Sequence, residues 1–214
     1  MRADAVLLDL LLPRRCPGCG SPAERSLCPA CLAAAARLAL PDRTPVELAP
    51  GVAAVAAFSY DGVIADAVRT VKAGGSHASA RGLGDLMRRV LRLPDAPTTW
   101  VPSSRRRLRE RGVEIPRLLA GPRAVAMLVR PVDRPDQTTL GPAARRASPR
   151  GSFAARAGTV PPPAVILVDD VRTTGATAGA AATALRAAGA RRVLVATFAV
   201  AGREVGLGRP GFEG

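Results

Sequence analysis

Aromatic side chains are scarce in this 214-residue sequence, and lysine and histidine occur once each. Four phenylalanines, one tryptophan and one tyrosine are too few for an obvious platform on which nucleic-acid bases would stack. No stretch reaches the roughly 20 apolar residues that a membrane-spanning helix needs. The sequence has no Gly-Lys-Ser/Thr phosphate loop, and no Gly-x-Gly-x-x-Gly motif follows an expected strand. These absences exclude a membrane span and two familiar nucleotide-binding loops.

Positive charge dominates, with 31 Arg and Lys residues against 17 Asp and Glu residues and a formal net charge of +14. The hydrophobic fraction of 48% excludes a disordered chain. Abundant Ala, Gly, Pro and Arg suggest a GC-rich genome, so the number of arginines by itself says little about function. The same bias makes the one lysine, Lys72, informative, because a compact ammonium can be required where a planar guanidinium would not substitute. Chance survival of one lysine codon is the alternative.

The N-terminal stretch, MRADAVLLDLLLPRRC, contains an apolar run like that of a secretion signal. Asp4 and Asp9 interrupt this run, and no small-residue cleavage site follows. We therefore expect an amphipathic helix that docks on the body of a cytoplasmic protein.

All four cysteines lie in one short segment with the pattern C-x2-C, eight residues, C-x2-C: Cys16, Cys19, Cys28 and Cys31. Each Cys-Pro-x-Cys turn can aim two thiolates at one ion, and two such turns form a closed tetrahedral site of the structural zinc type. A disulfide pair is the first alternative, but without an export signal a stable disulfide is not expected. A redox dithiol is the second, although it would need only one such turn. The spacing therefore predicts structural Zn²⁺, which would supply most of the stability of this small element.

Residues 165–177, VILVDDVRTTGAT, form the most informative segment. Its β-branched and apolar start predicts a buried strand, which ends in two adjacent acids. A loop rich in hydroxyl groups and an Ala-rich helix follow at once. The loop N–H groups and the helix dipole can hold a phosphate, while acids at the carboxyl edge of a strand can accept hydrogen bonds from sugar hydroxyls. The segment predicts a phosphate-ester site formed by Asp169, Asp170, Val171, Thr173, Thr174, Gly175, Ala176 and Thr177.

An ordinary capped strand–turn–helix is the alternative interpretation, since Asp and Thr favour helix N-caps. Capping accounts for one acid or one threonine, but not for two acids facing three threonines and a glycine. Two neighbouring carboxylates repel each other, and a structure tolerates them more readily when a ligand or a metal uses them.

Strand and helix patterns alternate along most of the chain, which predicts an α/β fold with a mostly parallel sheet flanked by helices. We expect an N-terminal helix and zinc element over 1–45, a main domain over 51–202 and a loose tail over 203–214. Residues 41–51 read as a Pro-punctuated linker. In the main domain we expect strands at 52–60, at a short segment ending at 101–102, and at 124–132, 165–170 and 191–201. We expect helices at 61–75, at 80–93 and from near Pro116, besides the Ala-rich helix that follows residue 177.

An arginine-rich segment, SRRRLRERG, follows the second of these strands. Five arginines between residues 105 and 111 form either a solvated face or a mobile cationic loop that closes over polyphosphate. The arginine guanidinium can bind two phosphate oxygens at once through paired hydrogen bonds, which favours the second interpretation. Arg105, Arg107 and Arg111 are therefore candidate catalytic residues, together with Lys72. Residues 134–153 are irregular, polar and long enough for a functional flap.

The 165–177 segment resembles the phosphoribosyl pyrophosphate (PRPP) signature of type I phosphoribosyltransferases. The motifs of the whole chain, in their order, resemble the ComF family of competence-associated, phosphoribosyltransferase-like proteins. Those motifs are the cysteine pattern, Val71-Lys72-Ala73-Gly74, Val101-Pro102 to Arg111-Gly112, the Gln137, Leu140, Arg145, Gly151 and Phe153 pattern, and DDVRTTGAT. The sequence departs from the family at Ser103, at Val113-Glu114-Ile115 and at Ser148, all toward the acceptor side.

The resemblance implies that Asp169 and Asp170 bind the ribose hydroxyls and that the threonine loop wraps the 5′-phosphate. The expected activity is Mg²⁺-dependent transfer of ribosyl-5-phosphate from PRPP to an unidentified acceptor, with release of pyrophosphate and a link to DNA uptake. Two alternatives stay open: a non-catalytic accessory protein that binds single-stranded DNA or the DNA-uptake machinery, and a PRPP sensor without turnover. No motif identifies the acceptor.

Overall fold

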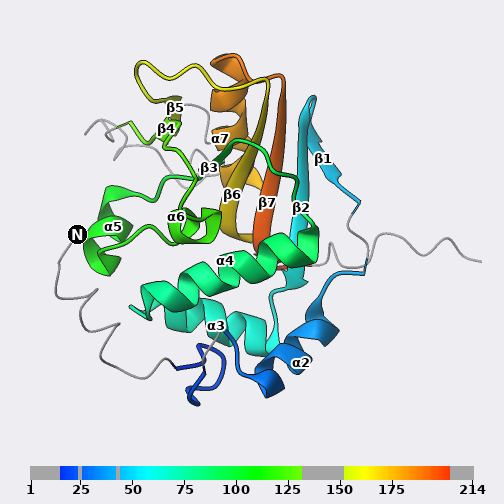
Figure 1. Cartoon of the computed structure of the whole chain (residues 1–214). Helices are drawn as coiled ribbons and strands as arrows, with labels where there is room; N and C mark the ends of the chain where they lie inside the picture. Colours follow the sequence, from blue (N-terminus) through cyan, green and yellow to red (C-terminus); the bar gives the residue numbers. More distant parts are fainter. Residues whose placement is uncertain (1–14, 24–25, 42–43, 132–151, 203–214) are drawn as a thin grey trace, which may run out of the picture.

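The computed structural model describes residues 15–23, 26–41, 44–131 and 152–202. A five-stranded sheet forms its centre (Figure 1). The strand order is β1 (Val46–Ala49), β2 (Val52–Ser59), β7 (Arg192–Val200), β6 (Ala164–Arg172) and β3 (Thr98–Trp100). Strands β2, β7, β6 and β3 run parallel, and β1 joins the edge antiparallel to β2. The carboxyl ends of the parallel strands therefore meet at one edge of the sheet, as in open α/β folds that bind ligands there.

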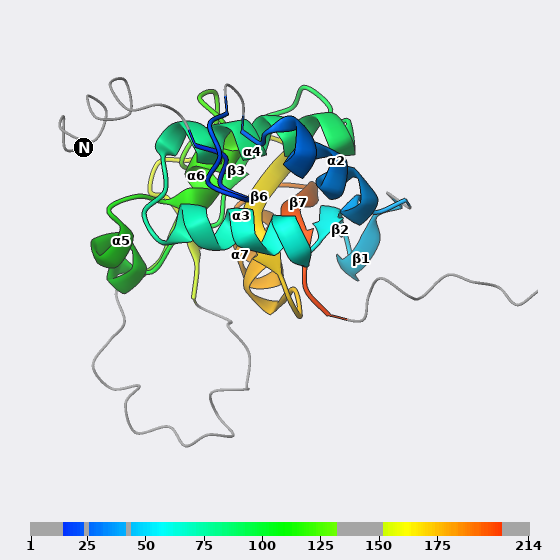
Figure 2. The ribbon, with the colours of Figure 1, turned by 90° about the horizontal axis from the view of Figure 1, so that it is seen from below.

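Both faces of the central strands are buried, because their apolar runs carry no alternating polar residues. On one face Ile166 and Val168 pack with the helices α3 (Gly62–Lys72), α4 (His77–Leu91) and α6 (Ile115–Ala120). On the other face Val165 and Leu167 pack against α7 (Ala176–Ala187). Seen from below, α4 and α7 lie on opposite sides of the sheet (Figure 2).

The cysteine segment packs directly on the main body. Cys16, Cys28 and Cys31 belong to the same buried cluster as α3 and α4, together with α2 (Pro29–Leu38). The contact is close, since a Cβ on Gly18 would lie 2.5 Å from Val63 Cγ2, on α3. The cysteine segment and the helix that carries Lys72 are thus parts of one core.

The expected α/β class with a mostly parallel sheet, flanking helices and an N-terminal four-cysteine element is confirmed at this level. The expected helix near Pro116 is confirmed as α6, with the proline in its first turn. Among the described residues, no helix has both the length and the apolar character needed to cross a bilayer.

Three local expectations are wrong. The linker over 41–51 contains β1, whose residues gain hydrogen bonds from β2 that the sequence pattern does not reveal. The expected strand over 124–132 is reduced to β4 (Leu128–Val129), which pairs with β5 (Ala154–Ala155) in a separate two-stranded sheet. The arginine-rich segment is a short helix, α5 (Arg105–Arg111), because Ser104 caps its start and Gly112, at φ +70°, ends it.

Some expectations fall outside the described residues. These are the amphipathic helix over the first fourteen residues, nearly all of the flap over 134–153, and the tail over 203–214. At the end of the flap, Phe153 is described and is buried against the α7 side of the sheet.

Candidate functional site

Two adjacent carboxylates lie near the carboxyl end of β6. The strand continues beyond them to Arg172, so Asp169 and Asp170 are part of the sheet, with Asp169 in register with Thr197 of β7. Because side chains alternate along a strand, Asp170 lies on the same face as Val168, toward α3, and Asp169 on the opposite face, toward α7. The pair can therefore reach two different sets of neighbours.

Asp169 is the more perturbed of the two acids. It is buried, and its Oδ1 accepts a hydrogen bond of 2.9 Å from the Asp170 N–H. Burial, and then the nearby charge of Asp170, raise the pKa of Asp169 from an ordinary 3.8 to about 7. This carboxylate therefore ionises near neutral pH, and a bound cation or hydroxyl donor would favour its charged form.

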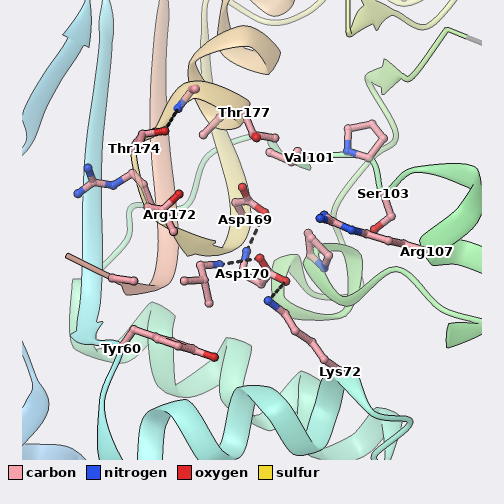
Figure 3. Close-up of a pocket in the computed structure, with 18 of the residues that line it drawn as sticks. Tyr60, Lys72, Val101, Ser103, Arg107, Asp169, Asp170, Arg172, Thr174 and Thr177 are labelled. Carbon is pink, nitrogen blue, oxygen red and sulfur yellow. Dashed lines mark hydrogen bonds and ion pairs between the residues drawn. The ribbon is translucent and has the colours of Figure 1, made fainter. Parts of the chain in front are cut away.

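Asp170 forms an ion pair with Lys72, across a distance of 2.8 Å between Nζ and Oδ2. Lys72 is the last residue of α3, and both side chains are partly buried. A second Asp170 oxygen, Oδ1, accepts a 2.6 Å hydrogen bond from the Val171 N–H. The single lysine of the sequence thus lies directly at the acid pair, as Figure 3 shows.

The segment between β6 and α7 forms the expected loop-to-helix junction. Gly175 has φ +75° and is the N-cap of α7 without a side-chain cap of its own. A residue with a Cβ is disfavoured in this left-handed conformation, which accounts for the glycine. Thr174 Oγ1 accepts a hydrogen bond of 3.4 Å from the Ala176 N–H. The first turn of α7, a helix of twelve residues, borders the same cavity as the acids. The positive end of the helix dipole therefore faces that cavity.

A cavity of about 370 Å³ connects these groups. It brings together Lys72, Arg107, Arg111 and all eight residues expected to form the phosphate-ester site: Asp169, Asp170, Val171, Thr173, Thr174, Gly175, Ala176 and Thr177. In Figure 3 the Arg107 side chain extends from α5 toward the acids. Arg105, at the start of α5, is exposed and is not among the described residues that line this cavity. Its role stays a prediction.

Several lining residues were not predicted from the sequence. Tyr60, which follows β2, and Ser103 line the cavity near Lys72 and Arg107 respectively. Arg130 also lines it, and its guanidinium lies 4.4 Å from the centre of the Phe153 ring. In the sequence, Tyr60 stands at the end of the expected strand 52–60, and Ser103 stands just after the short strand that ends at 101–102. These positions were the available signal, because ligands bind at the carboxyl ends of strands in such sheets.

The four cysteine sulfur atoms form a second candidate site. All four lie within 4.8 Å of one another, and none is in a disulfide. The Cys28 N–H donates to Cys16 Sγ at 3.4 Å, and hydrogen bonds from Ser21 lower the pKa of the Cys19 thiol to about 6. A set of four thiolates suits a tetrahedral Zn²⁺ ion. The structure thus supports a metal site at the cysteines predicted from their spacing.

The cavity presents cations, two acids, hydroxyl groups and a helix N-terminus to one ligand-sized space. Cations and the helix end suit phosphate groups, and the acids suit hydroxyl groups or a divalent cation. No protein-family model matches the sequence, and no curated protein matches it significantly.

Proposed function

We propose that this protein is a ComF-like phosphoribosyltransferase that binds PRPP with Mg²⁺ and transfers ribosyl-5-phosphate to an acceptor, releasing pyrophosphate. The observation that carries the proposal is the convergence of Lys72, the acid pair, the threonine loop and α5 arginines on one cavity at the carboxyl edge of a parallel sheet. PRPP has a ribose with two free hydroxyl groups, a phosphate group on C5 and a pyrophosphate group on C1. Each of these has a matching part in the cavity.

The carboxylates of Asp169 and Asp170 would accept hydrogen bonds from the ribose hydroxyls. The N–H groups at the start of α7 and the hydroxyl of Thr177 would hold the 5′-phosphate. Lys72 and Arg107 would stabilise the negative charge that collects on the leaving pyrophosphate as its bond to the ribose breaks. The protein would contribute mainly position and charge, because this reaction requires no covalent bond to a side chain.

Mg²⁺ would supply further positive charge to the pyrophosphate. The donor set fits this ion, since carboxylate and phosphate oxygens are the hard ligands that Mg²⁺ prefers, and both acids border the cavity. Burial, and then the charge of Asp170, raise the pKa of Asp169, and a nearby cation would favour its charged form by offsetting the repulsion between the two carboxylates.

Calorimetry with PRPP and Mg²⁺ tests the donor half of the proposal. Replacing Asp169 and Asp170 together with asparagine should abolish PRPP affinity while the fold is kept. Unaltered PRPP binding in this variant would refute the assigned role of the pair. Pyrophosphate release in a panel of nucleobases and amines then separates a transferase from a PRPP sensor, because a sensor binds PRPP without releasing pyrophosphate.

A nucleic-acid-binding accessory protein of DNA uptake is the second candidate. The exposed arginines of α5 and the formal net charge of +14 favour it. Binding through charge alone would be independent of sequence and would weaken steeply with salt. Filter binding of single-stranded DNA across a salt series, with and without PRPP, tests this function separately from PRPP affinity.

A further inference from the structure

The helix α5 has no buried residue, although each of its seven residues is described. In both views it lies at the edge of the molecule, away from the sheet (Figures 1 and 2). Two of its arginines nevertheless line the cavity, Arg107 and Arg111. An exposed helix without a packed face is not fixed by hydrophobic contacts, so the segments at its two ends must determine where these arginines lie.

One side chain joins those two ends. Glu114 follows α5 by three residues, and its Oε1 accepts a 3.0 Å hydrogen bond from the Ser103 N–H, just before the helix. Its Oε2 accepts a second 3.0 Å hydrogen bond, from Nε1 of Trp100 at the end of β3. We call these two contacts the Glu114 bridge. Both oxygens of one carboxylate are used, and each bond is charge-assisted and therefore stronger than a neutral one.

The base of the Glu114 bridge is rigid. Trp100 is buried and belongs to the sheet, and Glu114 directly precedes α6, most of which is buried. The adjoining turn is held from another side as well, since Arg130 Nε donates to the Pro102 carbonyl oxygen at 3.0 Å. The segment from 103 to 114 is therefore a loop that is closed at its base and carries an otherwise exposed helix.

We propose that Glu114 is a positioning residue for the pyrophosphate end of the substrate: by closing this loop, it holds Arg107 and Arg111 at the cavity. The inference rests on the proposed function for the identity of the anion. The expected effect of Glu114 on anion binding is opposite to the effect of its charge alone. Through its charge alone, the Glu114 carboxylate would weaken anion binding, whereas its hydrogen bonds strengthen binding by fixing two cations at the cavity.

Calorimetry with inorganic pyrophosphate tests the inference. The full-length protein is used, with the proposed Zn²⁺ and Mg²⁺ present. Glu114→Gln removes the charge, and its amide can accept only one of the two N–H groups. We expect it to bind pyrophosphate roughly tenfold more weakly, the equivalent of one lost charge-assisted hydrogen bond. Unchanged or tighter binding would overturn the inference, because tighter binding is what removal of a negative charge alone predicts.

Glu110→Gln is the matched control, since Glu110 lies on α5 and its only described ion pair is an exposed one with Arg106. This variant removes the same charge and leaves the Glu114 bridge intact, so its pyrophosphate affinity should stay within about twofold of the wild type. An equal loss of affinity in both variants would contradict a special role for Glu114.

Trp100 is the only tryptophan of the chain and provides an independent readout. Its emission should change in Glu114→Gln, because the indole N–H loses or weakens its charged acceptor, and should not change in Glu110→Gln. Identical emission spectra in all three proteins would show that the contact is not made and would overturn the inference. If the wild-type protein does not bind pyrophosphate, both the inference and the proposed function fail. If the wild-type protein binds pyrophosphate but the two variants have equal affinities for it, only the inference about Glu114 fails.

Discussion

Replacing Asp169 with asparagine should stabilise the ligand-free protein at neutral and alkaline pH, while it removes the affinity for PRPP that we propose. The amide oxygen of the new side chain can still accept the hydrogen bond that the Asp170 N–H donates to Asp169. The amide cannot ionise, so the substitution removes the cost of holding a buried carboxylate next to a second one. Stability and ligand binding therefore change in opposite directions at this position.

The magnitude follows from the raised pKa. Burial and the charge of Asp170 move the pKa of Asp169 from 3.8 to about 7, and each pH unit corresponds to about 1.36 kcal/mol. The folded protein retains a proton that the unfolded chain has released, so the stability of the wild type falls as pH rises from about 4 to about 7. The stabilisation by asparagine should be near zero at about pH 3 and reach about 4 kcal/mol at about pH 8.

Urea unfolding at several pH values between about 3 and 8, followed by circular dichroism, measures this difference. Asp66→Asn provides the control, because it removes an exposed carboxylate from α3. A difference in unfolding free energy between Asp169→Asn and the wild type that does not vary with pH would refute the reasoning. So would a loss of stability at the alkaline end of the series.

Three further changes test other parts of the structure. Cys28→Ser should release bound zinc and unfold the cysteine element; an unchanged zinc content by mass spectrometry would contradict a four-cysteine site. Gly175→Ala should destabilise the protein by about 1–2 kcal/mol in thermal unfolding, because φ is +75° there, and a neutral effect would contradict that backbone conformation. Lys72→Met should weaken pyrophosphate binding measured by calorimetry, since it removes the ammonium beside Asp170, and unchanged affinity would contradict its role.

Local patterns predicted much of the site. The strand, the acid pair and the loop before α7 were recognisable in residues 165–177, because each depends on neighbours only a few residues away. The cysteine spacing predicted a cluster for the same reason. The apolar segment at 124–132 predicted a long strand and was wrong, since strand length depends on a partner that the sequence pattern does not reveal.

The charge and exposure of the arginine-rich segment were evident in the sequence, but its secondary structure was not. It is a helix, because Ser104 and Gly112 supply the two caps, and residues 105–111 alone do not reveal that only two of its arginines reach the cavity. Glu114 was visible only as a departure from a family pattern. Its role follows from contacts with Trp100 and Ser103, which lie 14 and 11 residues away in the chain.

The sequence by itself determined the chemical groups of the two candidate sites and their order: four cysteines for one, and one lysine, an arginine cluster, two acids and a threonine loop for the other. The tertiary structure decided which groups meet. Lys72 and Asp170, far apart in the chain, form a 2.8 Å ion pair because α3 and the face of β6 on which Asp170 lies share one buried cluster. The raised pKa of Asp169 likewise depends on burial, which local sequence does not specify, because it is produced by every element packed around the strand.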